Sequence, residues 1–516
     1  MKLDAAKDSL PVAIVNMLVL NTIHERAAAL EVPPEDGLKS KLLPEDEAIG
    51  MDAARYIRFA SAAYGMLMLK GANVMSWDCG WPAVHKMSLQ ELNSWCIIKH
   101  CGVADEDLVK INIFQTRKLH LPAYIIVVDH ATKSVVLSVR GTFSVEDAVT
   151  DLVCDSAAFM GGSCHRGLRQ GAEFLLEDAK DDLVKTLSEN AGYRLVLCGH
   201  SLGGGVSTLL TMMILHRRRD LGINRRTQIL CYAFAPPPVF GPLNRVPAEA
   251  KKAIRSFVFR HDMVPRLSLA NVYGLFRDLR EVDTVGTSFP SRCKYLVRER
   301  MPHVSVEDDG LGARGLSVSL RYSTILHRTG FRGGTKSKQH HCTTTTTTTK
   351  INNSKPKSAS RGETAVTNAD ADADADRTRE EQDPLEHFVL RKLAEDFTAD
   401  GRARLPSQKN AYRAERTAVL AHDMGRERYE KLIIPGSIFH LRKLGDIATA
   451  ALAAEQDGVV AEGRRTPLYW MERESPAQLA RILMVDTAIV DHLPNAYESA
   501  LHNLYGDGLP KKNLVD

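Results

Sequence analysis

The stretch Tyr193-Arg-Leu-Val-Leu-Cys-Gly-His-Ser-Leu-Gly203 decides the fold of this chain. The apolar residues from Leu195 to Leu197 predict a strand that is buried on both faces. Apolar residues then recur at helical spacing after the serine, at Leu202, Val206, Leu209, Leu210 and Met213. Ser201 is therefore predicted to lie on a strand-to-helix turn, which is the context that a G-x-S-x-G nucleophile elbow requires.

The glycines of this motif support the same interpretation. Gly199 and Gly203 lack a Cβ, so strand and helix can approach closely while Ser201 adopts a strained backbone that points its hydroxyl outward. The alternative is a glycine-rich turn whose serine has no catalytic role. A phosphate loop is disfavoured because the motif lacks the lysine of G-x-x-x-x-G-K-[ST]. We expect His200 to point away from the serine hydroxyl and to pack or hydrogen-bond elsewhere.

The acid of a catalytic triad should follow the serine in the chain. A serine hydroxyl needs a base to remove its proton, that base needs an acid to fix its tautomer, and α/β-hydrolases supply them in the order Ser, Asp, His. Asp262 comes directly after the strand-like run 256–260, and catalytic groups of parallel sheets collect at the carboxyl ends of strands. We expect Asp262 to be the acid, ahead of Asp278 and Asp283 in a polar, helical stretch. A turn or N-cap aspartate is the alternative.

The base must come from a histidine further along the chain. The candidates are His303, His327, His440, His492 and His502. We expect His492, because Pro494 breaks the chain before a C-terminal helix and leaves the imidazole on an ordered loop. His440 is the alternative. It closes the strand-like run 432–440, where an imidazole commonly satisfies a backbone group.

The tetrahedral intermediate needs hydrogen-bond donors that are fixed in advance. One is the amide of the residue after the nucleophile, Leu202. The second is expected from Thr142, because the strand-like run 135–140 leads into Gly141-Thr142-Phe143. The sequence thus predicts an oxyanion hole made from Thr142 and Leu202.

Further motifs extend this pattern along the chain. They are Val139-Arg-Gly-Thr142 with Asp147 and Asp151, then Cys164-His-Arg-Gly-Leu168, Gly199-His-Ser-Leu-Gly-Gly204 and Asp262-Met-Val-Pro-Arg266. With them the chain resembles the fungal-type class 3 lipases, and within these the sn-1-specific diacylglycerol lipases, from roughly 124 to 280 and again at 434–441 and 491–494. The resemblance implies an α/β-hydrolase fold with a mainly parallel central sheet. It also implies Ser201, Asp262 and His492 as nucleophile, acid and base, Thr142 and Leu202 as oxyanion donors, and no metal or cofactor.

Animal membrane-bound members of this family carry a block of transmembrane helices, and none is expected here. The run Leu10–Leu20 contains Pro11 and Asn16 and falls short of the ~20 apolar residues that a span needs. Residues 1–22 also lack the basic start and the cleavage site of a signal peptide. We expect a cytoplasmic protein that can contact membranes peripherally.

Composition excludes several other classes. A net charge of +4 over 516 residues gives no general attraction to nucleic acid. The nine cysteines show no C-x-x-C spacing, so they indicate neither a disulfide framework nor a zinc site. Cys198 and Cys231 lie in predicted strands and are expected to be buried thiols. His340-His341-Cys342 lacks a second pair of ligands, so no metal site is predicted.

The chain divides into four segments in this interpretation. Residues 1–110 form an N-terminal helical cap region, 111–300 the first part of the hydrolase core, 301–430 an insertion, and 431–516 the second part with the catalytic histidine. Within the insertion, 328–383 is predicted to be disordered because it contains a run of threonines at 343–349 and an Asp-Ala repeat near 370–376. This insertion is either a regulator of access to Ser201 or an inert linker.

The function predicted from the sequence is a lipase that cleaves a fatty acyl ester of diacylglycerol or a related glycerolipid through an acyl-enzyme on Ser201. The alternatives are a phospholipase A1, a carboxylesterase for soluble esters, and a lipase-like signalling scaffold without catalysis. The complete set of Ser, Asp and His in chain order favours an enzyme. Its partner would be glycerolipid at a membrane or lipid-droplet surface, and no nucleic acid is expected.

The surfaces that would meet lipid are placed only coarsely by the sequence. The segment 144–160 is a candidate cover, and Phe234 with 236–240 a candidate wall of the acyl groove. Basic residues in 292–300 and 314–332 could meet anionic headgroups, each contributing about 1 kcal/mol near such a surface. The amphipathic run 57–69 is expected to pack on the core instead.

Overall fold

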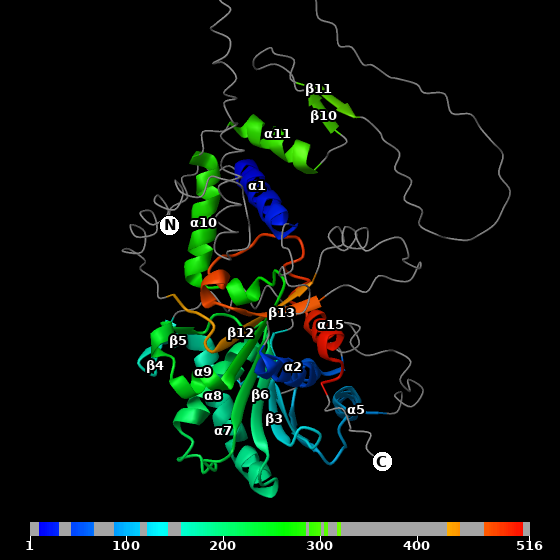
Figure 1. Cartoon of the computed structure of the whole chain (residues 1–516), viewed down its shortest axis with the longest axis vertical. Helices are drawn as coiled ribbons and strands as arrows, with labels where there is room; N and C mark the ends of the chain where they lie inside the picture. The colour runs from blue at the N-terminus through cyan, green and yellow to red at the C-terminus, as the bar shows by residue number, and fades with distance from the viewer. Residues whose placement is uncertain are drawn as a thin grey trace, which may run out of the picture.

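A mainly parallel eight-stranded sheet forms the centre of the molecule (Figure 1). The computed structural model describes residues 10–29, 43–66, 87–113, 121–142, 156–284, 288–300, 304–307, 317–320, 431–443 and 469–508. In sheet order the strands are β1 (Leu108–Asn112), β2 (Tyr124–Asp129), β3 (Ser134–Val139), β6 (Arg194–His200), β7 (Ile229–Phe234), β9 (Ile254–Phe259), β12 (Ser437–Lys443) and β13 (Tyr469–Glu474). Within this sheet, β3, β6, β7, β9 and β12 run parallel, and β1, β2 and β13 run antiparallel to their neighbours. The predicted α/β-hydrolase fold is confirmed.

Helices cover both faces of this sheet. One face carries α7 (Arg166–Glu189), α8 (Leu202–His216) and α9 (Ala248–Ala253), and the other carries α2 (Pro44–Ala62), α5 (Leu89–Cys101) and α15 (Pro494–Tyr505). Side chains of β6 alternate between the two hydrophobic cores: Leu195 and Leu197 pack on the α8 side, Val196 and Cys198 on the α2 side. This alternation explains why the central strands read as continuous apolar runs.

A group of three helices lies beyond the carboxyl edge of the sheet (Figure 1). It consists of α1 (Leu10–Ala29), α10 (Leu269–Thr284) and α11 (Phe289–Arg300), held together by a hydrophobic cluster that includes Val19, Leu20 and Val282. The apolar run at 10–20 continues as helix to Ala29, but of the helices that the structure describes none has the length and apolar character to cross a bilayer.

Short elements complete the described structure. Strands β4 (Ser156–Phe159), β5 (Gly162–His165) and β8 (Phe240–Gly241) form a three-stranded sheet, and β10 (Val304–Glu307) pairs with β11 (Ser317–Leu320). Three 3-10 turns follow at η1 (Leu243–Arg245), η2 (Val264–Arg266) and η3 (Pro476–Leu479).

One predicted strand begins later than the sequence suggested. The run 432–440 was expected to be a strand that His440 closes, but β12 starts at Ser437 and continues to Lys443, so His440 lies in its middle. Pro435 and Gly436 interrupt the run, and Gly436 has a φ of +88° that a strand does not use. Ile433 forms a single bridge with Phe240 instead.

The N-terminal region contributes directly to the hydrolase core. The buried face of α2, which includes Ala53, Ile57 and Ala60, packs against β6 and β7, so the expected packing of the run at 57–69 is confirmed for its described part. Strand β1 already begins at Leu108. Most of the 301–430 segment, with its threonine run and His340-His341-Cys342, lies outside the described residues, as does 144–155 of the expected cover. The domain boundaries therefore stay predictions.

Candidate active site

The serine elbow lies where β6 runs into α8. Ser201 has φ +59° and ψ −131°, a conformation that costs a residue with a side chain roughly 1 to 3 kcal/mol. A Cβ on Gly199 would lie 2.5 Å from the Gly203 backbone, and one on Gly203 would lie 2.2 Å from the Val139 carbonyl oxygen. The predicted strand-turn-helix context is confirmed, and the glycines are required by these contacts.

His492 reaches the serine from the distant C-terminal segment. Its Nε2 lies 2.9 Å from the Ser201 Oγ, within hydrogen-bond distance. Pro494 occupies the first turn of α15, as expected from the sequence, and His492 lies in the ordered turn just before that helix. The hydroxyl can therefore donate its proton to the imidazole without any rearrangement of either side chain.

Asp262 holds the other side of the imidazole. Both of its carboxylate oxygens lie 3.0 Å from His492 Nδ1, so the ring donates its Nδ1 proton to the carboxylate and keeps Nε2 free to accept. The carboxylate also accepts from the Val264 amide at 2.9 Å and from the Tyr497 hydroxyl at 2.6 Å. Asp262 has no exposed surface, so these donors replace its hydration.

Tyr497 is a residue of this site that sequence reasoning missed. Its hydroxyl donates to Asp262 and accepts from the Phe259 amide at 2.9 Å. Burial and the neighbouring Asp262 charge raise the pKa of Tyr497 well above its ordinary value, so the hydroxyl remains a donor at any working pH. Its position on the buried face of an amphipathic helix predicts packing and gives no signal for this contact.

His200 bonds away from the serine, as expected. One ring nitrogen, Nε2, lies 2.7 Å from the His492 carbonyl oxygen, and Nδ1 lies 3.0 Å from the Tyr64 hydroxyl. Burial and the nearby His492 lower the pKa of His200 well below its ordinary value. The ring is therefore neutral, with one donor nitrogen and one acceptor nitrogen.

The structure brings the expected oxyanion residues close to the elbow. Thr142 follows β3, and Gly141 before it packs so tightly that a Cβ there would lie 3.1 Å from the Ser201 Cβ and 2.7 Å from the His200 carbonyl oxygen. Leu202 is the first residue of α8, where backbone amides have no partner within the helix. Their role as oxyanion donors stays a prediction.

His440 lies in a separate polar cluster. Its Nδ1 is 3.0 Å from a Glu474 oxygen, and its Nε2 donates to the Arg260 carbonyl at 2.7 Å. Ligand atoms of His440, Glu472 and Glu474 lie within 4.8 Å of one another, a spacing that could hold a metal ion. The Arg442 guanidinium already bonds both glutamates, however, so a cation would have to displace it. This arrangement favours a structural role for the cluster.

The remaining candidates lie away from the serine. Asp278 pairs with Arg481 at 3.0 Å, and His502 pairs with the exposed Asp507 at 3.4 Å. Asp283 belongs to α10, as expected from its polar, helical stretch, whereas His303 and His327 lie outside the described residues.

The two strand cysteines are buried thiols, as expected. Cys198 and Cys231 are both completely buried. Burial raises the pKa of both thiols, that of Cys231 to about 12. They are therefore protonated and unreactive at neutral pH.

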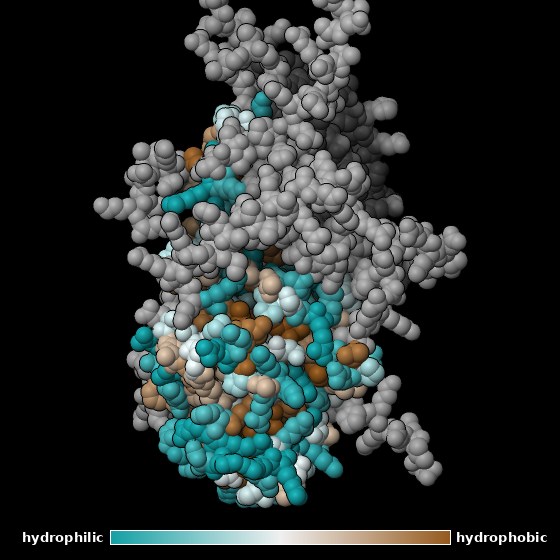
Figure 2. All heavy atoms as spheres, turned by 60° about the vertical axis from the view of Figure 1, so that its left-hand side comes forward, coloured by the Kyte–Doolittle hydropathy of each residue, from teal (hydrophilic) through white to brown (hydrophobic). Residues whose placement is uncertain are grey.

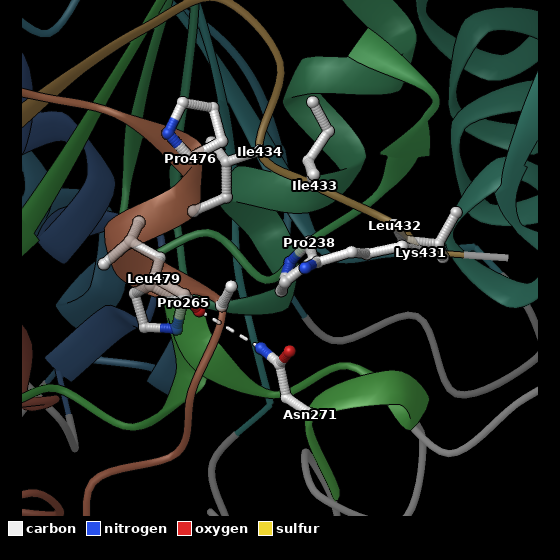
Figure 3. Close-up of a pocket in the computed structure, with 10 residues that line it drawn as sticks. Pro238, Pro265, Asn271, Lys431, Leu432, Ile433, Ile434, Pro476 and Leu479 are labelled. Carbon is white, nitrogen blue, oxygen red and sulfur yellow. Dashed lines mark hydrogen bonds between the residues drawn. The ribbon is translucent and has the colours of Figure 1, made fainter. Parts of the chain in front are cut away.

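A small hollow lies beside the acid loop, the segment 260–268 between β9 and α10 that carries Asp262 (Figure 3). It encloses about 250 Å³, counting space open to solvent, and its lining includes Pro238, Pro265, Asn271 and Leu479. Pro238 belongs to the expected groove wall, whereas Phe234 and Phe240 have no exposed surface and pack into the core. Because no triad residue lines this hollow, it is distinct from the serine site.

The site itself is closed. The exposed fractions are 2% for Ser201, 4% for His492 and 0% for Asp262. Low exposure strengthens the hydrogen bonds among these groups, because water does not compete for them.

Comparison with known proteins connects this geometry to a family. Residues 136–272 match the family model for lipase (class 3). Mouse diacylglycerol lipase-beta is 30% identical over 274 residues, which are 48% of this chain and 39% of that protein. Secreted mono- and diacylglycerol lipase A of Penicillium cyclopium is 29% identical over 155 residues, which are 28% of this chain and 47% of that protein.

Solved lipase structures are also similar. The crystal structure of a lipase from Rhizopus microsporus var. chinensis aligns with 20% identity and a TM-score of 0.33, covering 46% of this chain and 76% of that one. This chain spans less than half the length of the two curated relatives described above. Through residues 136–272, which carry the serine elbow and the acid loop, this chain is a relative of the class 3 lipases.

Proposed function

We propose that this chain is a serine hydrolase of the lipase type, which cleaves a fatty acyl ester of diacylglycerol or a related glycerolipid. The observation that carries the proposal is the His492 imidazole between two partners, with Nε2 2.9 Å from Ser201 Oγ and Nδ1 3.0 Å from Asp262. The similarity to diacylglycerol lipases supports this choice of substrate class. In this proposal Ser201, His492 and Asp262 are nucleophile, base and acid.

Acylation begins at the ester carbonyl. Ser201 Oγ attacks the carbonyl carbon as its proton passes to His492 Nε2, and the carbonyl π electrons move onto oxygen. The Leu202 amide and Thr142 would hold that oxyanion. When the oxyanion collapses, the bond to the glyceride oxygen breaks and the leaving oxygen takes the proton from Nε2. The products are a deacylated alcohol and an acyl-Ser201 ester.

Deacylation repeats these steps with water. Water gives a proton to His492 Nε2 and attacks the acyl carbon, and collapse of the second intermediate returns that proton to Ser201 Oγ. The fatty acid leaves. Throughout, Asp262 keeps the imidazole in the tautomer that accepts at Nε2 and stabilises the imidazolium when it forms, held in turn by the Val264 amide and the Tyr497 hydroxyl.

We further propose that the protein takes its substrate from a lipid surface, working peripherally from the cytoplasmic side. Two adjacent apolar residues close to the base, Ile489 and Val490, are 55% and 60% exposed. On α10 the aromatic residues Tyr273 and Phe276 are 41% and 47% exposed, and Arg280 is exposed on the same side of that helix. Apolar side chains with nearby basic residues suit the boundary between acyl chains and anionic headgroups.

The visible surface differs in hydropathy along the length of the molecule. In Figure 2 the lower end of the molecule carries mainly hydrophilic side chains, and hydrophobic ones gather nearer the middle. The lower end is the one away from helices α1, α10 and α11, which lie at the carboxyl edge of the sheet (Figure 1).

Lipid-surface contact is tested with the double variant Ile489→Ser, Val490→Ser. We expect weaker co-sedimentation with vesicles of phosphatidylcholine and phosphatidylserine, and unchanged hydrolysis of a short-chain soluble ester. The matched control is Leu89→Ser, at a 55% exposed apolar residue that begins α5. Equal sedimentation of the double variant, the control and the unmodified chain would remove these two residues from the docking surface.

The function itself is tested by fatty-acid release from diacylglycerol in mixed vesicles, beside phosphatidylcholine and a short-chain ester. Preferential turnover of diacylglycerol that Ser201→Ala abolishes is the expected result. Preferential turnover of phosphatidylcholine would assign a phospholipase, and turnover of the soluble ester alone a carboxylesterase. No turnover of any ester, and no reaction of Ser201 with a fluorophosphonate, would leave a lipase-like scaffold.

A further inference from the structure

One buried tyrosine hydroxyl connects the two halves of the proposed active site. Tyr64 follows α2 and is 2% exposed, and its hydroxyl lies 3.0 Å from His200 Nδ1. The same hydroxyl packs against Gly141, where an added Cβ would lie 2.5 Å from the Tyr64 oxygen. Gly141 directly precedes Thr142, whereas His200 directly precedes Ser201. The hydroxyl therefore lies between the serine elbow and the end of β3, which leads to the expected oxyanion residue Thr142 and is called the oxyanion strand below.

The direction of each hydrogen bond in this series is set by the groups that it joins. The His492 carbonyl oxygen can only accept, so His200 Nε2, 2.7 Å away, must carry the proton. Burial keeps His200 neutral, which leaves Nδ1 as an acceptor. Burial also raises the pKa of Tyr64 above its ordinary value, so its hydroxyl stays protonated and donates to that nitrogen. One tautomer of His200 satisfies both contacts.

We propose that Tyr64 and His200 are positioning residues that hold the base and the oxyanion strand in a fixed relation to Ser201. The hydrogen bonds run from the Tyr64 hydroxyl through the His200 ring to the His492 carbonyl, and the same hydroxyl packs against Gly141 just after β3. This inference rests on the proposed function, because it assigns His492 as the base and Thr142 as an oxyanion residue.

The packing around His200 explains why this chain of bonds would matter. The centroid of its ring lies 4.8 Å from that of the His492 ring and 5.8 Å from that of the Tyr497 ring. One side of the base therefore packs against His200. If His200 changed tautomer, Nε2 would lose its proton and would face the His492 carbonyl as a second acceptor. The backbone of the base would then shift, and a displacement near 1 Å can cost roughly a hundredfold in rate.

Kinetics of a variant series tests the proposal. Tyr64→Phe removes one oxygen atom and should lower kcat and the rate of fluorophosphonate labelling about tenfold or more, with little change in KM. His200→Gln places an amide N–H near the position of Nε2 and should keep more activity than His200→Leu. The matched control is Tyr56→Phe on α2, the helix that Tyr64 follows; its hydroxyl bonds Ser134 at the start of β3, away from the serine. This control should lower stability and leave kcat unchanged.

A measurement that does not need turnover checks the arrangement itself. In the full chain labelled with ¹³C,¹⁵N-histidine, the His200 signals, identified by their loss in His200→Gln, should show the neutral Nε2–H tautomer. They should not titrate between about pH 5.5 and 8, the range in which an ordinary histidine changes charge. In Tyr64→Phe the same signals should shift toward a mixture of tautomers.

These two measurements separate the inference from the function on which it rests. An unmodified chain that neither hydrolyses esters nor reacts with the fluorophosphonate would refute the proposed function, and the His200 tautomer would still decide the hydrogen-bond arrangement. Equal kcat in Tyr64→Phe and Tyr56→Phe, an Nδ1–H tautomer of His200, or a His200 that titrates near neutral pH would each overturn the positioning role.

Discussion

Replacing Tyr497 by phenylalanine removes one hydroxyl that serves two buried groups. The hydroxyl donates to Asp262 at 2.6 Å and accepts from the Phe259 amide at 2.9 Å, in a place with no exposed surface. A hydrogen bond to a charged group contributes about 1.5 to 3 kcal/mol, and a buried donor left without a partner costs about 1 to 3 kcal/mol. The phenyl ring keeps its packing, so we expect the free energy of unfolding to fall by roughly 3 kcal/mol.

The assay for Tyr497→Phe is thermal unfolding beside ester hydrolysis. A loss of roughly 3 kcal/mol corresponds to a Tm about 6 to 12 °C lower for a domain of a few hundred residues. The effect on kcat should be smaller, about tenfold, because Asp262 keeps its contacts to His492 and to the Val264 amide. Activity falls for a different reason than stability, since a carboxylate with one donor fewer holds the imidazole less firmly.

The control for this prediction is Tyr505→Phe. Tyr505 lies on the same helix, α15, and its hydroxyl faces the Met471 sulfur at 3.9 Å, which is a weak acceptor. We expect a change in Tm of a few degrees at most. If Tyr497→Phe and Tyr505→Phe unfolded at the same temperature with the same kcat, the hydroxyl of Tyr497 would not be holding the acid loop.

Three further predictions test other parts of the site. His492→Ala should lower kcat at least about a thousandfold whereas His440→Ala should stay within about tenfold, measured per folded molecule, and the opposite result would make His440 the base. Gly203→Ala should abolish Ser201 labelling, because its Cβ would lie 2.2 Å from the Val139 carbonyl oxygen; a fully reactive alanine variant would refute the need for this close approach. Burial acts to raise the pKa of Glu474, but the hydrogen bond from His440 and the Arg442 charge outweigh it and lower that pKa. Its stabilisation is therefore present above about pH 4.5 and lost as the pH falls through the lowered value, so urea unfolding of Glu474→Gln should show a flatter acid dependence, and an equal slope would contradict this account.

The sequence predicted those parts of the site whose signals are local. The elbow could be inferred because a buried strand and an apolar helical face flank Ser201 within a short stretch. Asp262 followed from its place after a strand, and His492 from Pro494 beside it. In each case the backbone environment is set by neighbours in the chain, which a single sequence contains.

The residues that sequence reasoning missed act through tertiary contacts. Tyr64 and Tyr497 lie on or beside amphipathic helices, where the apolar pattern predicts burial but not the group that the hydroxyl meets. The start of β12 was misplaced for a related reason. Leu432 to Ile434 are as apolar as a strand, but Ile433 pairs with Phe240 from another sheet, which only the folded chain reveals.

The acid loop and the start of α10 also hold the segment that precedes the base, mainly through main-chain acceptors. Arg266 donates to the Gln478 carbonyl at 2.9 Å, and Asn271 donates to the Leu479 carbonyl at 3.1 Å (Figure 3). Closer to the base, Arg260 pairs with Asp491 at 3.3 Å. Carbonyl acceptors are present whatever side chains the segment carries, so these two hydrogen bonds depend on their donors, Arg266 in the acid loop and Asn271 in α10, and on the backbone path of η3. Asp262 and His492 are therefore held together by the structure around them as well as by their own hydrogen bond, and a base drawn from so distant a part of the chain can still meet the serine in one geometry.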